Sequence, residues 1–476
     1  MTLGSRRVVL LSVTLATGVV QSASAMSATG PSQAAPPTGA PAGYAITGVA
    51  VVDVEKGLVR SDQTVIVVGD RVQRIGPRAA VPVRKTLRVI DGRGQFLMPG
   101  LVDAHVHYAD PPVFGRMMIA NGVLAVRDTG QPNESALALR SALNSGTMLG
   151  PEMLVTGLIL DGVPPFIPQA SIGVRSPDEG RAAVRKQAEA GVDQIKMYSR
   201  LEKDVFLAIM DEAKRVGLKP IGHVPESVYV EDAAAAGQRS IEHLHGFGKL
   251  IGRLLGEPVV LKTGGIGTDI DFWPRLAEVN RDTLRTTLHH IAATGVVVCP
   301  TVMVFKAQAG LTEQAMAQRT YPMSDYVSPV IEGYWKAFWD PSQRTLMEKT
   351  WPPMAAFVGE LHRAGVTLMV GTDLMMAGVI PGYSVHEEMA LWQDAGIPAA
   401  DVLRSATIVP ARFLGRDSRV GSVAEGKVAS LVLVRANPLE NIRNARQIEG
   451  VFLRGRYYSH ADLDQLLKEA RDLARH

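Results

Sequence analysis

The sequence predicts an α/β protein, in which a (β/α)8 TIM-like barrel stands beside a small β-sandwich domain. Three observations predict this fold class. Apolar, strand-like runs alternate with helical patterns through residues 100–415. Eight such runs occur there, which is the number of strands in a closed barrel. Short β-branched runs lie on both sides of this middle region, so both ends of the chain are expected to share one sheet domain.

The chain begins with the pattern of an export signal. Residues 5–7 carry positive charge, residues 8–20 are mostly apolar, and residues 23–25 offer small side chains for cleavage. The apolar run is shorter than the roughly 20 residues that cross a bilayer. We therefore expect a signal peptide over 1–25, an exported protein that is periplasmic or secreted, and no stable membrane insertion after cleavage. The paired arginines also resemble a twin-arginine signal, so Sec and twin-arginine export both stay open, as does an uncleaved anchor.

A flexible linker and the flanking sheet domain come next in the prediction. Residues 26–43 are rich in Ala, Pro, Gly and Ser and have little apolar surface to pack. Residues 44–99 and 416–476 are expected to form the composite β-sandwich domain. Their strand-like runs are 45–53, 64–71, 74–77, 87–91, 429–434 and 449–455.

The barrel is predicted over residues 100–415. Many of its strand-like runs are continuously apolar, as expected for parallel strands that are covered on both faces. An open doubly wound sheet or two separate domains are the alternatives. The aromatic-rich connections 247–284 and 306–356 are expected to form a lid over the substrate. The eight runs are 100–107, 122–129, 152–160, 193–198, 219–224, 239–245, 296–304 and 366–373, and helical patterns include 178–190, 203–216 and 282–293.

Composition excludes several classes of protein. The 476 residues are 46% hydrophobic and 20% charged, which is ordinary for a globular chain. The net charge is +3 and no basic stripe is interleaved with aromatic residues, so no nucleic-acid partner is expected. Cys299 is the single cysteine, which excludes an intrachain disulfide and a cysteine zinc cluster. We expect a small-molecule substrate. The apolar loops are compatible with a homo-oligomer, and the oligomeric state stays open.

Polar residues end five of the predicted strands. His105 and His107 are two residues apart, so both side chains point the same way from one strand. Taken alone, each residue is as well explained by a hydrogen-bonded structural role. Buried His, Lys and Asp side chains are costly unless they are paired or bind metal, and strand ends meet at one rim of a barrel. The sequence therefore predicts one pocket at this rim, in which the side chains are paired with one another or bound to metal: His105, His107, Lys196, His223, His243 and Asp373.

These residues, in this order, resemble the amidohydrolase superfamily over nearly the whole mature chain. Five short motifs are similar to those of the branch that holds Xaa-Pro dipeptidases and imidazolonepropionase-like enzymes. They are residues 195–198, 222–225, 241–244, 371–373 and 381–387. That branch includes enzymes that cleave amide bonds next to a free carboxylate, some of them acting on N-acyl amino acids or mycotoxin amides.

The resemblance implies a binuclear metal centre. His105, His107 and Asp373 would hold one ion, and His223 and His243 would hold the other. Lys196 would bridge both ions as a carbamate formed with CO2. Zinc suits these ligands best, and manganese, cobalt and iron are alternatives. A hydroxide shared by the ions would attack the carbonyl, while Asp373 passes the proton to the leaving nitrogen as general base and acid.

Four further residues are candidates for contact with the substrate. Tyr198 could act in catalysis or bind a carboxylate, and His245, His386 and Arg127 could line the pocket. The predicted function is thus an exported metal-dependent amidohydrolase that is dipeptidase-like or carboxypeptidase-like. The alternatives are a cyclic amide or lactone hydrolase of the same superfamily, and a non-catalytic metal- or solute-binding protein of the cell envelope.

Overall fold

The structure is a computed structural model that describes residues 43–257 and 270–475. The predicted signal peptide, all but the last residue of the predicted linker, and part of the predicted lid lie outside these ranges. Within them, no helix has both the length and the apolar character needed to cross a membrane.

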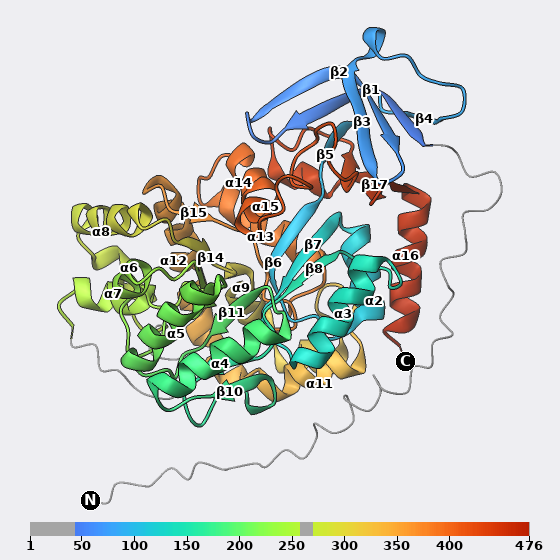
Figure 1. The fold of residues 1–476 in the computed structure, drawn as a ribbon. Helices are drawn as coiled ribbons and strands as arrows, with labels where there is room; N and C mark the ends of the chain where they lie inside the picture. Colours follow the sequence, from blue (N-terminus) through green and yellow to red (C-terminus); the bar gives the residue numbers. More distant parts are fainter. Residues whose placement is uncertain (1–42, 258–269, 476) are drawn as a thin grey trace, which may run out of the picture. The chain divides into compact units, whose positions relative to one another are not determined.

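The flanking domain is a mixed sheet to which both ends of the chain contribute, as predicted (Figure 1). The sheet order is β18-β17-β16-β5-β1-β2-β3, with β4 also paired to β1. Leu97 in β5 joins the two halves, because it pairs with Val51 on one side and Leu433 on the other. The strands are β1 (Tyr44–Asp53), β2 (Leu58–Val68), β3 (Arg71–Pro77), β4 (Arg88–Asp91), β5 (Phe96–Pro99), β16 (Leu431–Val434), β17 (Ile448–Leu453) and β18 (Arg456–Ser459).

The sheet curls so that its two halves face each other across an apolar core. The amide of Ala429 donates to the carbonyl of Asp70 at 2.7 Å, which brings the C-terminal segment to the edge at β3. The rings of Tyr44 in β1 and Phe452 in β17 meet edge to face with centroids 5.5 Å apart. Apolar side chains from both ends fill the space between the halves, among them Val51, Val65, Leu97 and Leu431.

The middle of the chain is a barrel of eight parallel strands, one in each predicted run. Hydrogen bonds from the amide of Ala104 to the carbonyl of Val370, and from Asp373 to His105, join the last strand to the first. The amide of Asp193 donates to Val155 and connects the third strand to the fourth. The strands are β6 (Leu101–Val106), β7 (Val123–Asp128), β8 (Glu152–Val155), β11 (Gln194–Met197), β12 (Lys219–Gly222), β13 (Ser240–Glu242), β14 (Val297–Cys299) and β15 (Thr367–Leu368), and β9 (Ile159–Asp161) and β10 (Ser171–Gly173) extend the sheet beside β11.

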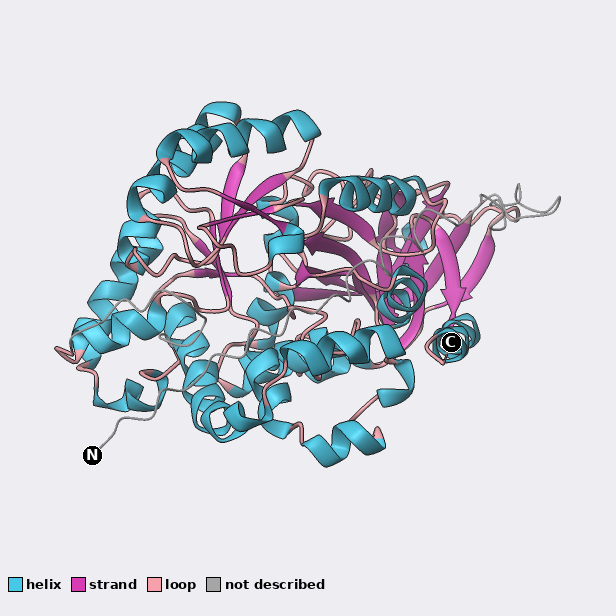
Figure 2. Ribbon diagram, turned by 90° about the horizontal axis from the view of Figure 1, so that it is seen from below, coloured by secondary structure: helices cyan, strands magenta, loops and turns pink. Residues whose placement is uncertain are grey.

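Helices surround these strands (Figure 2). Local signals set their ends: the Ser176 hydroxyl accepts from the amide of Glu179 at the start of α4, and Gly191 ends it with φ 81°. The helices are α2 (Pro111–Ala120), α3 (Asn133–Ser145), α4 (Pro177–Ala190), α5 (Lys203–Val216), α6 (Val230–Ala235), α7 (Phe247–Leu254), α8 (Arg281–Ala293), α9 (Val302–Gly310), α10 (Glu313–Gln318), α11 (Pro329–Phe338), α12 (Arg344–Arg363), α13 (Tyr383–Asp394), α14 (Ala399–Ser405), α15 (Ile408–Phe413) and α16 (His460–Leu473). Short 3-10 helices are η1 (Arg78–Ala80), η2 (Pro168–Ala170), η3 (Trp273–Glu278), η4 (Ser324–Tyr326), η5 (Pro341–Gln343) and η6 (Ile442–Arg446).

Several predicted strands are shorter than expected, and two of them end in left-handed turns. The run 296–304 leaves the strand after Cys299, turns through Thr301 with φ 48°, and enters α9. The run 239–245 ends at Glu242, because His243 has φ 59°. Both turns put non-glycine residues in the left-handed region, which an apolar pattern does not reveal.

The connection after β14 is largely helical, through α9, α10, α11 and α12. Trp335 in α11 and Trp273 in η3 are both 1% exposed, so these aromatic rings pack into the core. The C-terminal helix α16 packs against α2 of the barrel, where Arg116 donates to Glu469 at 2.9 Å.

Candidate metal centre

The structure brings the six predicted metal ligands together at the carboxyl ends of the barrel strands. Asp373 is at the centre of the group. Its Oδ1 lies 3.5 Å from Nε2 of His105 and 3.5 Å from Nε2 of His107, and its Oδ2 lies 3.8 Å from Nδ1 of His243. Ligand atoms of His105, His243 and Asp373 all lie within 4.8 Å of one another. Lys196 reaches the same point, with Nζ 3.2 Å from Nε2 of His105.

His223 completes the group from the end of β12. Its ring centroid is 5.1 Å from that of His243. On its faces it stacks between Tyr198 and His245, with both centroid distances 3.9 Å. The four imidazoles, the amine and the carboxylate thus come from five strand ends and share one small volume.

The backbone holds Asp373 in an unusual conformation. Its φ is 55°, and left-handed non-glycine residues of this kind cost about 1–3 kcal/mol each and occur preferentially at functional sites. The buried carboxylate of Asp103 fixes the preceding residue by accepting from the Thr372 amide at 3.0 Å and hydroxyl at 2.6 Å. A Cβ on Gly371 would lie 2.5 Å from Sγ of Cys299 and 2.9 Å from Cβ of His105, so only glycine permits this approach.

Each of the four histidines has its Nδ1 in contact with a fixed oxygen atom. Metal-binding histidines usually have such a partner, which orients the ring and leaves the other nitrogen for the metal. The pairs are His105 with Glu242 Oε2 at 2.7 Å, His107 with Gly130 O at 3.2 Å, His223 with Ser199 Oγ at 2.8 Å, and His243 with Thr301 Oγ1 at 2.8 Å. The residues present therefore fit a metal site.

Burial keeps the imidazoles in the form that binds metals. Desolvation lowers the pKa of His105, His223 and His243 well below the usual range, so the rings are neutral at pH 7. Desolvation also lowers the pKa of Lys196 to about 8. Burial raises the pKa of Asp373, but its interactions with His243, His107 and Lys196 outweigh this effect, so its pKa lies below the ordinary value.

A deeper group of ligand atoms does not suit a metal. His105, Glu242 and Cys299 place one ligand atom each within 4.8 Å of one another. However, burial raises the pKa of the Cys299 thiol well above its usual value, so it stays protonated, and both Glu242 oxygens accept from Arg127.

Two predicted substrate contacts are not supported by the structure. Arg127 is fully buried, and its guanidinium points into the barrel, where it binds the carboxylate of Glu242. His386 lies in α13, 4% exposed, with Nε2 2.9 Å from the carbonyl of Asn121. A position at or after a strand end did not reveal the direction of either side chain.

Tyr198 and His245 do line the group of histidines. Together with His223 and Phe166 they form a column of rings. Its order is Phe166, Tyr198, His223, His245, and the centroids of Phe166 and Tyr198 are 5.9 Å apart. Burial raises the pKa of Tyr198, so its hydroxyl remains a proton donor. The guanidinium of Arg200 lies over the Phe166 ring at 5.4 Å, at the end of the column nearest the surface.

The sequence did not reveal the residues that hold the candidate ligands in place. Glu242, Thr301 and Ser199 contact the histidines, and Glu388 accepts from the amides of Val302 and Met303 just after Thr301. One signal in the sequence could have indicated them. Glu242 is a charged residue within a buried strand, and a buried charge needs a partner. Which partner it has depends on packing between strands that are distant in sequence.

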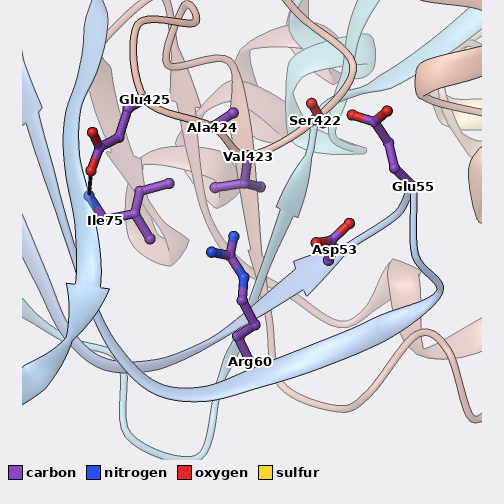
Figure 3. A pocket seen from close by; sticks show the side chains of 8 residues that line it. All are labelled: Asp53, Glu55, Arg60, Ile75, Ser422, Val423, Ala424 and Glu425. Atoms are coloured by element: carbon purple, nitrogen blue, oxygen red, sulfur yellow. Dashed lines mark hydrogen bonds between the residues drawn. The ribbon is translucent and has the colours of Figure 1, made fainter.

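A cavity of about 270 Å³ lies in the flanking domain, between β1, β2, β3 and the segment 422–425 (Figure 3). Arg60 points into it beside Asp53, and Glu425 accepts from the amide of Ile75 at 2.8 Å. It contains no imidazole, so the candidate chemistry lies at the barrel rim. Its lining is Asp53, Glu55, Arg60, Ile75, Ser422, Val423, Ala424 and Glu425.

Comparisons with known proteins agree with this geometry. The sequence model of the amidohydrolase family matches residues 96–457. A dihydroorotase of Geotalea daltonii is 24% identical over 187 residues, which is 38% of this chain and 43% of that protein, so the match spans less than half of the relative. Among solved structures, a bottromycin amidohydrolase is 25% identical, with a TM-score of 0.71 and 91% of each chain covered. A putative prolidase from Bifidobacterium longum is 24% identical, with a TM-score of 0.64 over 90% of this chain and 98% of that one.

Proposed function

The chain belongs to the amidohydrolase family of metal-dependent hydrolases, and on this premise we propose that it cleaves an amide bond in a small peptide-like substrate, such as a dipeptide or an N-acyl amino acid. The observation that carries the proposal is the convergence of four oriented imidazoles, Lys196 and Asp373 at one rim of the barrel. A site of this kind can bind divalent metal and also offers a carboxylate for proton transfer.

We propose that the site holds two divalent ions, zinc being the best match to its nitrogen and oxygen donors. His105, His107 and Asp373 would hold one ion, and His223 and His243 the other. Lys196 would lie between them as a carbamate. An ammonium group has no lone pair for a metal, whereas a carbamate is a bidentate anion. The lowered pKa of Lys196, about 8, supports this role because the neutral amine reacts with CO2.

When bound, such ions polarise a carbonyl oxygen and lower the pKa of a water molecule. Asp373 then moves the proton: its ionised carboxylate accepts it from the attacking water and delivers it to the leaving nitrogen as the C–N bond breaks. One water is consumed, and a carboxylic acid and an amine are formed. The strained backbone at Asp373 and the neighbouring His107 and His243 hold the carboxylate at this position.

The ring column supports a substrate that carries a free carboxylate. Tyr198 presents a protonated hydroxyl next to His223, and Arg200 lies at the outer end of the column. A hydroxyl donor and a guanidinium together suit a carboxylate, whereas a neutral lactone needs neither. This arrangement favours a peptide or N-acyl amino acid over a cyclic ester.

An activity screen of the metal-loaded protein tests the proposal. The panel contains dipeptides including Xaa-Pro, N-acyl amino acids, lactams and lactones, with metal-depleted protein as the control. We expect hydrolysis of amides next to a free carboxylate, lost on depletion and restored by zinc. Turnover of lactones or lactams alone would move the assignment to ring opening. Metal binding without any turnover would indicate a binding protein instead.

We also propose that the protein is exported, on the pattern of residues 1–25. N-terminal sequencing of the protein from the periplasm or the medium should find a chain that starts after residue 25. A full-length chain confined to the cytoplasm would contradict export.

A further inference from the structure

We propose that Arg127 and Glu242 are a positioning pair that sets the orientation and donor strength of His105 toward the metal site. This inference rests on the proposed function, because it assumes that His105 binds metal. The side chains of Arg127 and Glu242 are fully buried, so both would act only through His105.

The three residues form a continuous chain of contacts inside the barrel. Both oxygens of Glu242 lie 2.9 Å from Nη2 of Arg127, and Oε2 of Glu242 lies 2.7 Å from Nδ1 of His105. All three side chains are fully buried. They come from three strands, β7, β13 and β6, so the contacts link distant parts of the barrel beneath its rim.

Further contacts prevent the guanidinium from turning. Nε of Arg127 donates to the carbonyl of Ala104, next to His105, and Nη1 donates to Ser240 Oγ at 3.2 Å. The guanidinium also lies 5.6 Å from the ring centroid of Phe413. The Ser240 hydroxyl donates to Glu242 as well. The carboxylate therefore has a fixed position, and the His105 ring that contacts it is fixed in turn.

His105 differs in this respect from the other three histidines. The Nδ1 partners of His107, His223 and His243 are a backbone carbonyl and two hydroxyl groups, all of them neutral. Of the four, only His105 has a carboxylate within hydrogen-bond distance of its Nδ1. A carboxylate partner fixes the ring tautomer and raises the basicity of the nitrogen that faces the metal.

Arg127 has a separate part in this arrangement. A buried carboxylate without a counter-charge is strongly destabilising, and Arg127 supplies that counter-charge. Glu242 itself lies outside the proposed metal ligand set, because its carboxylate contacts Nδ1 of His105, whereas Nε2 of the same ring faces Lys196 and Asp373.

The alternative role for the pair is purely structural, as an ion pair that stabilises the barrel. The two roles make different predictions for two variants of the full chain. Glu242→Gln keeps the shape of the side chain but leaves Arg127 unpaired. The double variant Arg127→Met with Glu242→Gln removes both charges, so no buried charge is left uncompensated. Asp193→Asn is the control. Asp193 forms an ion pair with Arg140, with an N–O distance of 2.8 Å, and this pair does not contact the histidines.

The test measures metal affinity by competition with a chelator, the visible spectrum of the cobalt-loaded protein, and thermal stability. We expect Glu242→Gln to lower metal affinity by about 10–100-fold and to change the cobalt spectrum. The double variant should recover stability yet keep the low affinity and the altered spectrum. Asp193→Asn should change stability alone. If Glu242→Gln does not fold, the metal affinity and cobalt spectrum of the double variant distinguish the positioning role from the purely structural one.

Wild-type affinity and spectrum in the double variant would overturn the positioning role and leave the pair as a structural feature. A wild-type protein that binds no metal would overturn the proposed function and this inference with it. Metal binding by the wild type together with unaltered variants would overturn the inference alone.

Discussion

Replacing Asp373 by Asn should remove most of the turnover while leaving most of the metal. The pKa of Asp373 lies below the ordinary value of 3.8, so at pH 7 fewer than about one carboxyl in a thousand is protonated. The group is therefore available as a base in nearly every molecule. Asn has the same shape and keeps an oxygen as a potential ligand, but its neutral amide is too weak a base for the transfer.

The expected loss in kcat is about 10²–10⁴-fold, the usual contribution of a positioned acid–base group. This corresponds to about 2.7–5.4 kcal/mol in the activation free energy. The assay is steady-state kinetics on the best substrate of the screen, with metal content measured by elemental analysis on the same samples. The amide has the same size and shape as the carboxylate that it replaces, so the fold should persist. Wild-type kcat with full metal content would refute the assignment of Asp373 as the proton carrier.

Three other predictions follow from single positions. Lys196→Ala should lower the metal content from two ions per chain to one or fewer, with an unchanged circular dichroism spectrum; two ions retained would mean that Lys196 does not bridge. Arg200→Ala should raise KM about tenfold for substrates with a free carboxylate and leave kcat nearly unchanged, because it removes binding common to ground and transition states. An equal rise in KM for substrates without a carboxylate would count against contact between Arg200 and the substrate carboxylate. Burial lowers the pKa of His386 to about 4, so the unfolded chain takes up a proton below about pH 6.5 before the folded chain does. Its contribution to stability is thus complete above pH 6.5 and falls by up to about 3 kcal/mol as the pH drops to 4. Urea unfolding of His386→Gln at pH 7 and pH 5 should show a smaller pH dependence than the wild type, and an identical dependence would contradict this.

The barrel could be predicted because its strands are buried on both faces and read as apolar runs. Each of the eight predicted runs contains a strand, and the sheet built from both ends was also predicted. The lengths of the strands were predicted less accurately than their number and order. His243 and Thr301 adopt left-handed backbone conformations that end their strands early, and nothing in an apolar run marks such a turn.

The histidines, Lys196 and Asp373 were predicted because strand ends meet at one rim. Their partners were not, because a contact such as that of Glu242 with Arg127 depends on which strands face each other across the barrel. Arg127 illustrates the limit well. The sequence shows that it is near the end of a strand, but only the fold shows that it points to the interior and not to the substrate.

The most direct test of the metal centre is a crystal structure of the metal-loaded protein with anomalous diffraction at the zinc edge. We predict two anomalous peaks at the barrel rim, each about 2.0–2.2 Å from the nitrogen or oxygen atoms of its protein ligands. One peak should lie at His105, His107 and Asp373, the other at His223 and His243, with electron density for a carbamate on Lys196 between them. A rim without anomalous signal, or metal bound only elsewhere on the chain, would contradict the metal centre on which the proposed hydrolysis depends.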